Sequence, residues 1–417
     1  MMRLPLLGRG MAGYLSCRQT VGMTGAAMIE SVAKLLSPHD PADLEQAIRR
    51  RERLHLHTDQ PEAISTLLPW TTVNRLVTPE ALSSGRVVFV RENRSLPLEM
   101  TTVLPLGASD RTMRVNSVHS LCRQGVSLYI GRVDRLVPEI DLLGSLLERH
   151  LRTRIHINAY ISFSRDSAFR PHWDDHDVLV LQVSGRKRWW SFGQPFRYPS
   201  KAAAFANPGP VNLDEPAGEW VMEPGDILFL PRGEVHRAKV SGDNSVHLTI
   251  GMTPPRGTDV LHWLATRGIK EECLRRDVSP CSTPEELERQ ASELKTELHR
   301  LVDTLDLQVF LADEDRRCAF TPALNLNLGG ELTPSLLVRP TPRRRLPLPP
   351  ADAGVVELEV GDKRFTLSPL ERAVLAVLLA DEARSVAELC DAVPQAGVQA
   401  AIDSLAQKGL VTIVGSG

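Results

Sequence analysis

The sequence predicts a mainly β core, followed by an α-helical region and a small C-terminal winged-helix domain. Three observations support this prediction. Residues 73–251 consist mostly of short runs of β-branched and aromatic residues separated by turns, a texture typical of a barrel or sandwich. Apolar residues repeat at heptad spacing between residues 287 and 305. Residues 353–417 follow the order hairpin, three helices and strand, which is the outline of a winged helix.

The composition is that of an ordinary globular chain. Its 417 residues predict two to three domains, and 42% hydrophobic with 24% charged residues excludes wholesale disorder. A net charge of −2 gives no bulk attraction to nucleic acid or to an anionic membrane. No apolar run reaches the roughly 18 residues of a membrane-spanning helix. Six scattered cysteines without a CxxC pair predict reduced thiols in a cytoplasmic protein.

Residues 1–45 are expected to be an N-terminal extension without a functional role. The first 29 residues contain three arginines and no acidic residue, a composition that resembles a transit peptide. An extended or misassigned start, with Met28 as the initiator, is the favoured explanation. Residues 30–60 are predicted to be helical.

Residues 46–255 are expected to form the domain that contains the β core. A helix from Ile140 to Leu151 interrupts its strands. The clearest strands are Val87–Arg91, Ser127–Ile130, Ile155–Ile161 and Val178–Val183. Turns are predicted at Ser184-Gly185, Pro224–Asp226, Pro231–Gly233 and Ser241–Asn244.

Residues 256–333 are predicted to be a helical region. Thr283-Pro284-Glu285-Glu286 forms a capping box with proline at the first helical position, so a helix begins there. Its apolar residues form a seam, named here the leucine seam, that comprises Leu287, Ala291, Leu294, Leu298, Leu301 and Leu305. This helix packs either on its own domain or, as we favour, against a second copy of the chain.

Residues 334–352 contain six prolines and the run Arg343–Arg345, and an extended linker is predicted there. The winged helix is expected to span residues 353–417. From residue 368 onward, three basic residues face six acidic ones, so this part of the domain has a net charge of −3 and cannot neutralise phosphates. We therefore expect no DNA binding and a protein-contact or structural role instead.

The segment Pro171–Val178 contains the residues with the clearest chemistry. His172 and Asp174 are two residues apart, so both side chains leave the same face of a strand. An imidazole and a carboxylate together supply two of the three ligands of a non-haem Fe(II) facial triad. His236, which opens a strand after a Pro-Arg-Gly turn, supplies the third. By alternation His236 shares its face with Ala238 and Val240, whose small side chains leave room for a cofactor.

A single lysine follows on the next predicted strand. Alternation places Lys187 and Trp189 on one face, with Arg186 and Arg188 on the other. A lysine directed into an apolar barrel requires an anion, and a dicarboxylate lying on the metal would provide it. The alternative is an edge strand that carries several solvated basic residues.

Two motifs in this region resemble a known family. The first, HxDxxDVxxxQxxGxxxW, comprises His172, Asp174, Asp177, Val178, Gln182, Gly185 and Trp189, and the second, GDxLxxPxGxxH, ends at His236. Both are similar to motifs of the JmjC-type (cupin-4) oxygenases, in particular the ribosomal oxygenases that hydroxylate ribosomal proteins. The resemblance covers roughly residues 60–417. It implies a double-stranded β-helix core, a helical dimerisation region and a C-terminal winged helix, in that order.

The resemblance also implies roles for individual residues. His172, Asp174 and His236 match the iron ligands, and Lys187 matches the residue that pairs with the distal carboxylate of 2-oxoglutarate. Ser164 stands where a polar residue near the co-substrate is expected, and His247 on the last barrel strand is a further candidate. His176 shares the ligand face by parity, but the family motif has its carboxylate two residues after the first histidine. We therefore expect His176 to lie outside the ligand set.

The function implied is that of an Fe(II)- and 2-oxoglutarate-dependent protein hydroxylase. Its substrate would be an arginine or histidine side chain of a ribosomal protein, and the enzyme would be a homodimer that binds neither DNA nor a membrane. Two other functions remain open. One is hydroxylation of another peptide, such as the precursor of a modified-peptide natural product. The other is a metal-binding cupin without turnover that acts as a scaffold or regulator.

Overall fold

The structure is a computed structural model. It describes residue 29 and residues 31–163, 169–318, 320, 322–326, 332–344, 346–350, 354–381 and 383–414. The first 28 residues, Ser164 and Arg345 therefore lie outside the described residues.

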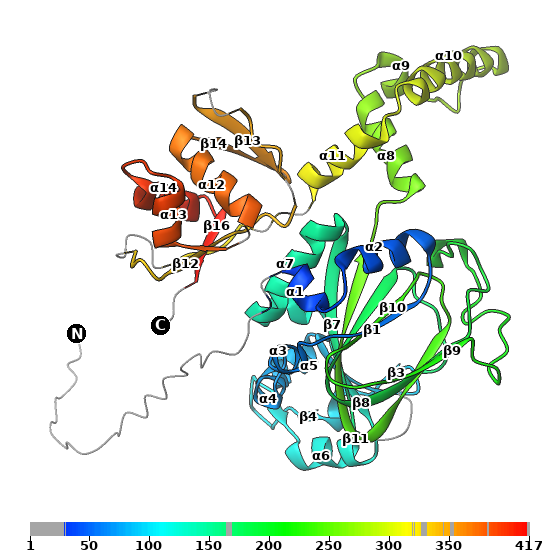
Figure 1. The fold of residues 1–417 in the computed structure, drawn as a ribbon. Coiled ribbons are helices and arrows are strands. Elements are labelled where there is room, and N and C mark those ends of the chain that lie inside the picture. Colours follow the sequence, from blue (N-terminus) through cyan, green and yellow to red (C-terminus); the bar gives the residue numbers. More distant parts are fainter. Residues whose placement is uncertain are drawn as a thin grey trace, which may run out of the picture.

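A nine-stranded antiparallel sheet forms the core of the first part of the chain (Figure 1). The predicted strands at residues 87–91, 127–130, 155–161 and 178–183 all lie in this sheet, so those predictions are confirmed. Its order is β1 (Leu54–His57), β10 (Asp226–Leu230), β8 (Asp177–Ser191), β11 (His236–Thr253), β7 (Arg154–Ser162), β6 (Ser127–Ile130), β2 (Val87–Arg91) and β3 (Arg94–Ser95), and β9 (Gly218–Met222) pairs with β8.

Strands β8 and β11 are longer than predicted, because two expected turns are bulges within them. Ser184-Gly185 and residues 241–244 lie inside these strands, and the β8–β11 register shifts between Val240 and Ser245. Gly185 has a φ of +66°, and a Cβ atom there would lie 1.9 Å from the carbonyl oxygen of Asn244. The prediction of two turns was wrong because glycine with polar neighbours marks a bulge as readily as a turn.

The glutamine of the first motif stabilises this bulge. Gln182 Nε2 donates to the carbonyl oxygen of Ser184 at 2.8 Å and to Ser245 Oγ at 2.9 Å. Past the bulge, residues 187–191 of β8 pair with β9, whereas residues 178–181 pair with β10. Each long strand thus belongs to two layers, and the space between the layers becomes a cavity.

The predicted N-terminal extension contributes to this core. Helices α1 (Val32–Leu36) and α2 (Pro41–Arg50) lie beside α7 (Pro138–Leu151) in Figure 1. Leu35, Leu36 and Leu44 are each at most 1% exposed and belong to the same core cluster as Ile140 and Leu143. The boundary at residue 46 was therefore wrong, because apolar side chains of residues 32–44 pack under the sheet. The predicted helix over 30–60 ends at Arg50, and strand β1 follows.

This part of the chain also contains four short helices that lie outside the sheet. They are α3 (Pro61–Ser65), α4 (Trp70–Leu76), α5 (Pro79–Ser83) and α6 (Val115–Arg123). The helix expected at residues 140–151 is α7, which begins two residues earlier at Pro138. Among all helices that the structure describes, none combines the length and apolarity needed to cross a membrane.

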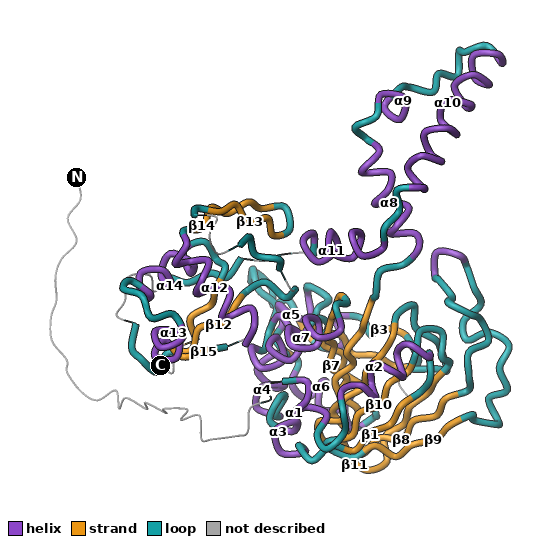
Figure 2. The backbone as a smooth tube through the Cα atoms, turned by 45° about the horizontal axis from the view of Figure 1, so that its top comes forward, coloured by secondary structure: helices purple, strands orange, loops and turns teal. Residues whose placement is uncertain are grey.

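The helical region forms an arm. It consists of α8 (Gly257–Gly268), α9 (Glu272–Arg275), α10 (Pro284–Asp303) and α11 (Leu307–Arg317), and Figures 1 and 2 show α9 and α10 projecting away from the rest of the chain. The Thr283 capping box is present as predicted. Leu301 is buried beside Gly268, but Leu287, Leu298 and Leu305 remain 38–50% exposed. Within the described residues, three of the six members of the leucine seam are therefore exposed, and Ala291 and Leu294 are half-buried.

The C-terminal region contains the expected elements in the expected order. A hairpin of β13 (Val356–Val360) and β14 (Lys363–Leu367) precedes α12 (Pro369–Asp381), α13 (Val386–Ala392), α14 (Val398–Gln407) and β16 (Val411–Val414). A core of its own forms around Leu375, Leu389 and Leu405, each fully buried. The assignment as a winged helix stays a prediction.

The prediction of an extended linker is wrong for the first half of residues 334–352. Residues Leu337–Pro340 form strand β12, which pairs with β16 and with the short β15 (Arg384–Ser385). Arg343 pairs with Asp141 on α7, and Arg344 Nε lies 3.4 Å from a Glu148 carboxylate oxygen on the same helix. Prolines predict an extended backbone, and a strand is also extended; only its partners distinguish a strand from a free linker.

The buried pair of Arg344 and Glu148 yields a test of stability. Both side chains are 6% exposed, so Arg344→Ala removes one of two guanidinium groups beside a buried carboxylate. Because Arg343 Nη1 stays 3.7 Å from Glu148, we expect a loss of roughly 1–3 kcal/mol in unfolding free energy. Arg364→Ala is the matched control, because its pair with Glu359 at 2.7 Å is 69% and 52% exposed and should contribute only about 0–1 kcal/mol. Urea denaturation measures both variants, and similar losses would contradict the prediction.

Candidate metal centre

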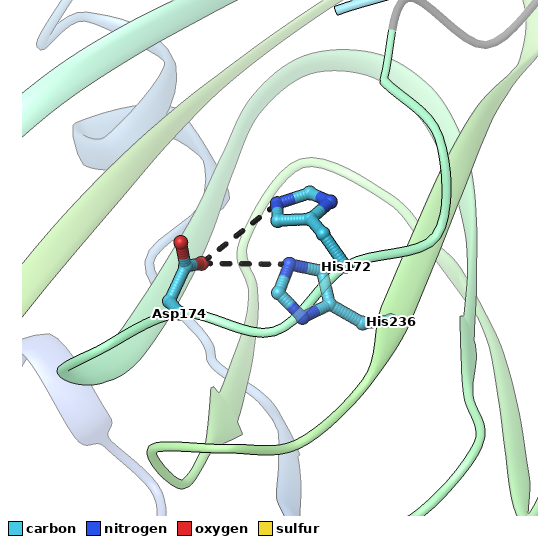
Figure 3. A group of neighbouring side chains, drawn as sticks. All are labelled: His172, Asp174 and His236. Carbon is cyan, nitrogen blue, oxygen red and sulfur yellow. Dashed lines mark ion pairs between the residues drawn. The ribbon is translucent and has the colours of Figure 1, made fainter. Parts of the chain in front are cut away.

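Three potential metal ligands meet at one end of the cavity between the layers (Figure 3). One ligand atom from each of His172, Asp174 and His236 lies within 4.8 Å of the other two. Asp174 Oδ2 is 4.0 Å from His172 Nε2 and 3.6 Å from His236 Nε2. Figure 3 shows both imidazole rings facing this carboxylate. Two imidazoles and one carboxylate at these separations suit a divalent transition metal with open coordination positions.

Backbone pairing brings the ligands together. His172 and His236 form a two-way bridge in which His172 N donates to His236 O at 3.1 Å and His236 N donates to His172 O at 2.9 Å. His236 is the first residue of β11, whereas Asp174 lies in the loop that leads into β8. Gly233 N donates to Asp174 O at 3.1 Å, which ties this loop to the predicted Pro-Arg-Gly turn. The strand that was expected to contain His172 and Asp174 is therefore present only as the bridge at His172.

Hydrogen bonds determine which nitrogen of each histidine faces the centre. His172 Nδ1 lies 2.8 Å from Arg170 O, and His236 Nδ1 lies 3.0 Å from Glu234 O. A carbonyl oxygen can only accept, so Nδ1 carries the proton in both rings. The lone pair of each Nε2 therefore points toward Asp174, as metal binding requires.

Electrostatics keep these groups in their metal-binding protonation states. Burial, together with the neighbouring His172, lowers the pKa of His236 to about 4, so its imidazole is neutral near pH 7. Burial acts to raise the pKa of Asp174, but His236 and His172 outweigh it and the pKa falls below its ordinary value. A neutral imidazole beside an ionised carboxylate is ready to accept a cation.

The cavity next to the triad has a volume of about 280 Å³ and a largely apolar wall. Val178, Trp189, Ala238 and Val240 line it, so Ala238 and Val240 share the face of His236 as alternation predicted. Lys187 also lines the cavity, and its side chain is buried. Arg186 and Arg188 on the same strand are exposed, as predicted.

Lys187 is the only lysine that lines this cavity among the described residues, and burial disfavours its charge. Its Nζ lies 3.2 Å from Ser162 Oγ and 3.5 Å from His247 Nδ1, and no carboxylate among those residues pairs with it. Burial lowers the pKa of Lys187 to about 7. An anion bound here would reverse this shift, because it would replace the lost hydration of the ammonium group.

The sequence analysis missed two polar residues that belong to this group. Tyr160 and Ser162 lie two residues apart on β7, and both line the cavity. The Tyr160 ring stacks on His247 with centroids 5.1 Å apart and an interplanar angle of 6°. Burial raises the pKa of Tyr160 and, with Lys187, lowers that of His247, so both rings are neutral. Period-two alternation of polar residues in an otherwise apolar strand was the available signal.

The remaining site predictions have different outcomes. His247 lies in the cavity beside Lys187, as described above. Ser164 follows Tyr160 and Ser162 in parity but lies outside the described residues. His176 Nε2 is 3.2 Å from His156 Nε2, and the two rings stack 4.9 Å apart. His176 lines a second cavity together with Arg51, Arg232 and Arg256.

The geometry predicts which substitutions remove the metal. His172→Ala or Asp174→Ala should weaken Co(II) or Fe(II) binding by more than about 100-fold, because even outer-shell partners of a metal site typically contribute 10–100-fold. His176→Ala is the matched control and should bind normally, because its Nε2 faces His156. Isothermal titration of metal into each apo variant measures this, with circular dichroism to verify folding. Unchanged affinity in His172→Ala would exclude this triad as the binding site.

Comparisons with known proteins agree with this site. Residues 135–260, which contain the whole triad, match the family model of the JmjC domain. The bifunctional lysine-specific demethylase and histidyl-hydroxylase NO66 of Drosophila willistoni is 28% identical over 222 residues, or 52% of this chain and 28% of that protein. Ribosomal oxygenase 1 of Rattus norvegicus is 34% identical over 135 residues, or 31% of this chain and 22% of that protein. The chain thus spans less than a third of the length of these relatives.

Among solved structures, YcfD, a ribosomal oxygenase from Escherichia coli in complex with cobalt and 2-oxoglutarate, is 16% identical to this chain. The alignment covers 89% of this chain and 98% of that one, with a TM-score of 0.49. The family assignment depends on the domain match and on the sequence relatives, together with the motif residues around the triad. Residues 135–260 of this chain therefore match the JmjC domain, and the chain is similar to the ribosomal oxygenases.

Proposed function

We propose that this protein is an Fe(II)- and 2-oxoglutarate-dependent oxygenase that hydroxylates an arginine or histidine side chain of a ribosomal protein. The observation that carries the proposal is the pairing of two sites in one cavity. The triad of His172, Asp174 and His236 provides a metal site, and the buried Lys187 provides a cation for an anionic ligand. A dicarboxylate that bridges a metal and an ammonium group satisfies both.

The donor set fits Fe(II). Both Nε2 lone pairs are directed at the Asp174 carboxylate, and three protein ligands leave further coordination positions open. Bound there, Fe(II) would supply the oxidative chemistry, with 2-oxoglutarate and O₂ as co-substrates and succinate and CO₂ as products. The chain itself supplies the orientation of the ligands, the cation that holds the co-substrate, and an apolar wall that excludes water.

Lys187 is the residue that would hold the distal carboxylate of 2-oxoglutarate. Ser162 Oγ and His247 Nδ1 flank its Nζ and can accept hydrogen bonds from the N–H groups that do not face the co-substrate. Because His247 is neutral, it adds no second positive charge that would repel Lys187. Tyr160 and Trp189 pack around His247 and keep this end of the cavity apolar, which strengthens a charge pair formed there.

The pKa of Lys187 predicts a proton uptake. At pH 8 the free lysine is mostly neutral, since its pKa is about 7, and binding of 2-oxoglutarate restores the charged form. Binding should therefore take up close to one proton, and affinity should fall as pH rises above about 7. Calorimetry of the metal-loaded protein in buffers with different ionisation enthalpies measures this uptake.

Substitutions of Lys187 distinguish the effect of its positive charge on 2-oxoglutarate affinity from the effect of its proton uptake. Lys187→Ala should raise the apparent KM for 2-oxoglutarate on the order of 100-fold or more, because losing one member of a buried charge pair costs roughly 3–5 kcal/mol. Lys187→Arg should retain more affinity and show no proton uptake, because a guanidinium stays protonated. If Lys187→Arg took up the same number of protons as the wild type, another group would be responsible.

The proposed substrate is supported by the relatives. One is named a histidyl-hydroxylase and another a ribosomal oxygenase. The purified enzyme with Fe(II), 2-oxoglutarate and ribosomal proteins should yield succinate together with a mass increase of one oxygen on an arginine or histidine. Asp174→Ala is the inactive control. If succinate formed only with another peptide, that peptide would be the substrate. If no succinate formed with any peptide, a cupin scaffold without turnover would be favoured.

We also propose that the helical arm forms a homodimer. Nothing in the described part of the chain covers Leu287, Leu298 and Leu305. Other large apolar side chains on the same arm are similarly exposed, namely Leu261, Ile269, Val278, Val302, Leu307 and Val309. Such a concentration of apolar surface on a projecting arm is typical of an interface, and a two-fold pair of arms would bury it.

The dimer has a direct test. Leu294→Glu with Leu298→Glu places charges in the leucine seam and should convert the dimer to monomer. Leu301→Ala is a useful contrast, since Leu301 is 7% exposed within its own chain and should reduce stability more than assembly. Sedimentation velocity at micromolar concentration measures the assembly of each variant. A wild-type protein that sediments as a monomer would contradict the proposal.

The C-terminal region is proposed to be a winged helix that contacts protein and not DNA. Its charge supports this, because six acidic residues oppose three basic ones from residue 368 onward. Two of the basic side chains are engaged within the chain: Lys408 pairs with Glu371, and Arg372 Nε donates to Pro349 O at 2.5 Å. A surface with this charge repels phosphate.

A further inference from the structure

The loop between β8 and β9, residues 192–217, contacts the residue that lies between two of the triad ligands. Asn207 Oδ1 accepts a hydrogen bond from Trp173 N at 3.0 Å, and Asn207 Nδ2 donates to Trp173 O at 2.9 Å. The indole Nε1 of Trp173 donates to Ala206 O at 2.8 Å. Three hydrogen bonds therefore connect this loop to the backbone and side chain of one residue.

The primary amide of Asn207 takes the place of a peptide group. His172 exchanges two backbone hydrogen bonds with His236, and the ladder ends there. Among the described residues, Trp173, the next residue, has no backbone partner for its N–H or C=O, and Asn207 bonds both. Asn207 offers one donor and one acceptor with the spacing of a peptide and extends the pairing by one residue.

The orientation of Trp173 affects the metal ligands on both sides of it. Its side chain is 1% exposed and packs with Phe192 and Val235. The hydrogen bonds from Asn207 hold the peptide groups that flank Trp173. Rotation of these groups would turn the Cα–Cβ bond of Asp174 away from the two histidines.

No other hydrogen bond to the Trp173 backbone is present in the described residues. Farther along the segment, Gly233 N donates to Asp174 O at 3.1 Å and Lys201 N donates to Asp175 Oδ2 at 3.3 Å. The second of these contacts again comes from the loop. The loop thus holds the ligand segment at Trp173 and at Asp175, with Asp174 between them.

We propose that Asn207 is a positioning residue through which the 192–217 loop controls the geometry and affinity of the metal centre. The inference rests on the proposed metal centre and adds to it a link between the ligands and a loop outside the triad. Because coupling between two equilibria is reciprocal, metal binding should in turn stabilise the loop. Asn207 is exposed, so its substitution leaves no cavity in the core.

Cobalt titration of the full-length apo protein tests this. Asn207→Ala should bind Co(II) about 10-fold or more weakly than the wild type and show altered visible absorption bands, since the bands report ligand geometry. Asn212→Ala is the matched control: Asn212 lies in the same loop and is exposed, and its Oδ1 accepts from Asp214 N at 3.1 Å. This control should match the wild type in affinity and spectrum.

Proteolysis tests the reverse direction of the coupling. Arg197 and Lys201 are exposed trypsin sites in the loop. Saturating Co(II) should slow cleavage there in the wild type and in Asn212→Ala, but much less in Asn207→Ala. Trp173→Phe keeps an aromatic ring, loses the bond to Ala206, and should also reduce the protection.

The outcomes are distinguishable. A wild-type protein that does not bind Co(II) would overturn the metal centre itself, and this inference with it. Normal Co(II) affinity, spectrum and protection in Asn207→Ala would overturn only the positioning role and leave the metal centre in place. Weaker binding in Asn212→Ala equal to that in Asn207→Ala would also overturn it, because any disturbance of the loop would then have the same effect.

Discussion

Two long strands, β8 and β11, remain hydrogen-bonded to each other through a bulge, and the site depends on this pairing. On one side of the bulge they join β10 and β7, and on the other they join β9 and the bridge to His172. The bulge needs Gly185 in a left-handed conformation with the Asn244 carbonyl close against it. Without this change of direction, Lys187 and His236 would not face the same cavity as His247.

The pairing also explains the motif residues that do not touch the cavity. Gln182 donates to backbone and side-chain oxygens at the bulge. Asp177 accepts from Arg51 Nη1 at 2.6 Å and from Arg232 N at 2.7 Å, which anchors the turn before His236. Both residues therefore place the ligands without contacting them. A motif of this kind combines chemistry with the supports that give the chemistry its geometry.

Burial determines the charge state of the site. The cavity keeps His236 and His247 neutral and lowers the pKa of Lys187 to about 7, all chiefly through desolvation. Burial acts to raise the pKa of Asp174, but electrostatic interaction with the neighbouring histidines outweighs it, and the pKa stays below its ordinary value. The site is thus arranged for a cation at one end and an anion at the other. A metal ion compensates the buried charge of Asp174, and a ligand that binds this metal and also carries a carboxylate compensates the buried ammonium group of Lys187.

The triad residues, Lys187 and most of the secondary structure could be predicted from local patterns in the sequence. Strand alternation was sufficient to place Lys187 opposite the two exposed arginines and His236 beside Ala238 and Val240, because a period of two needs no knowledge of the partners. The capping box at Thr283 and the C-terminal hairpin and helices also follow from local signals.

The partners of each segment, by contrast, depend on long-range contacts in the folded chain. The glycine at 185 marks a bulge because β11 lies against it, and residues 337–340 form a strand because β16 lies beside them. Helices α1 and α2 belong to the core because α7 and the sheet cover them. Asn207 holds Trp173 across 34 residues of sequence, a contact that no local pattern encodes. Periodicity reports the conformation of one segment, whereas burial, pairing and long-range hydrogen bonds depend on what the folded chain brings against it.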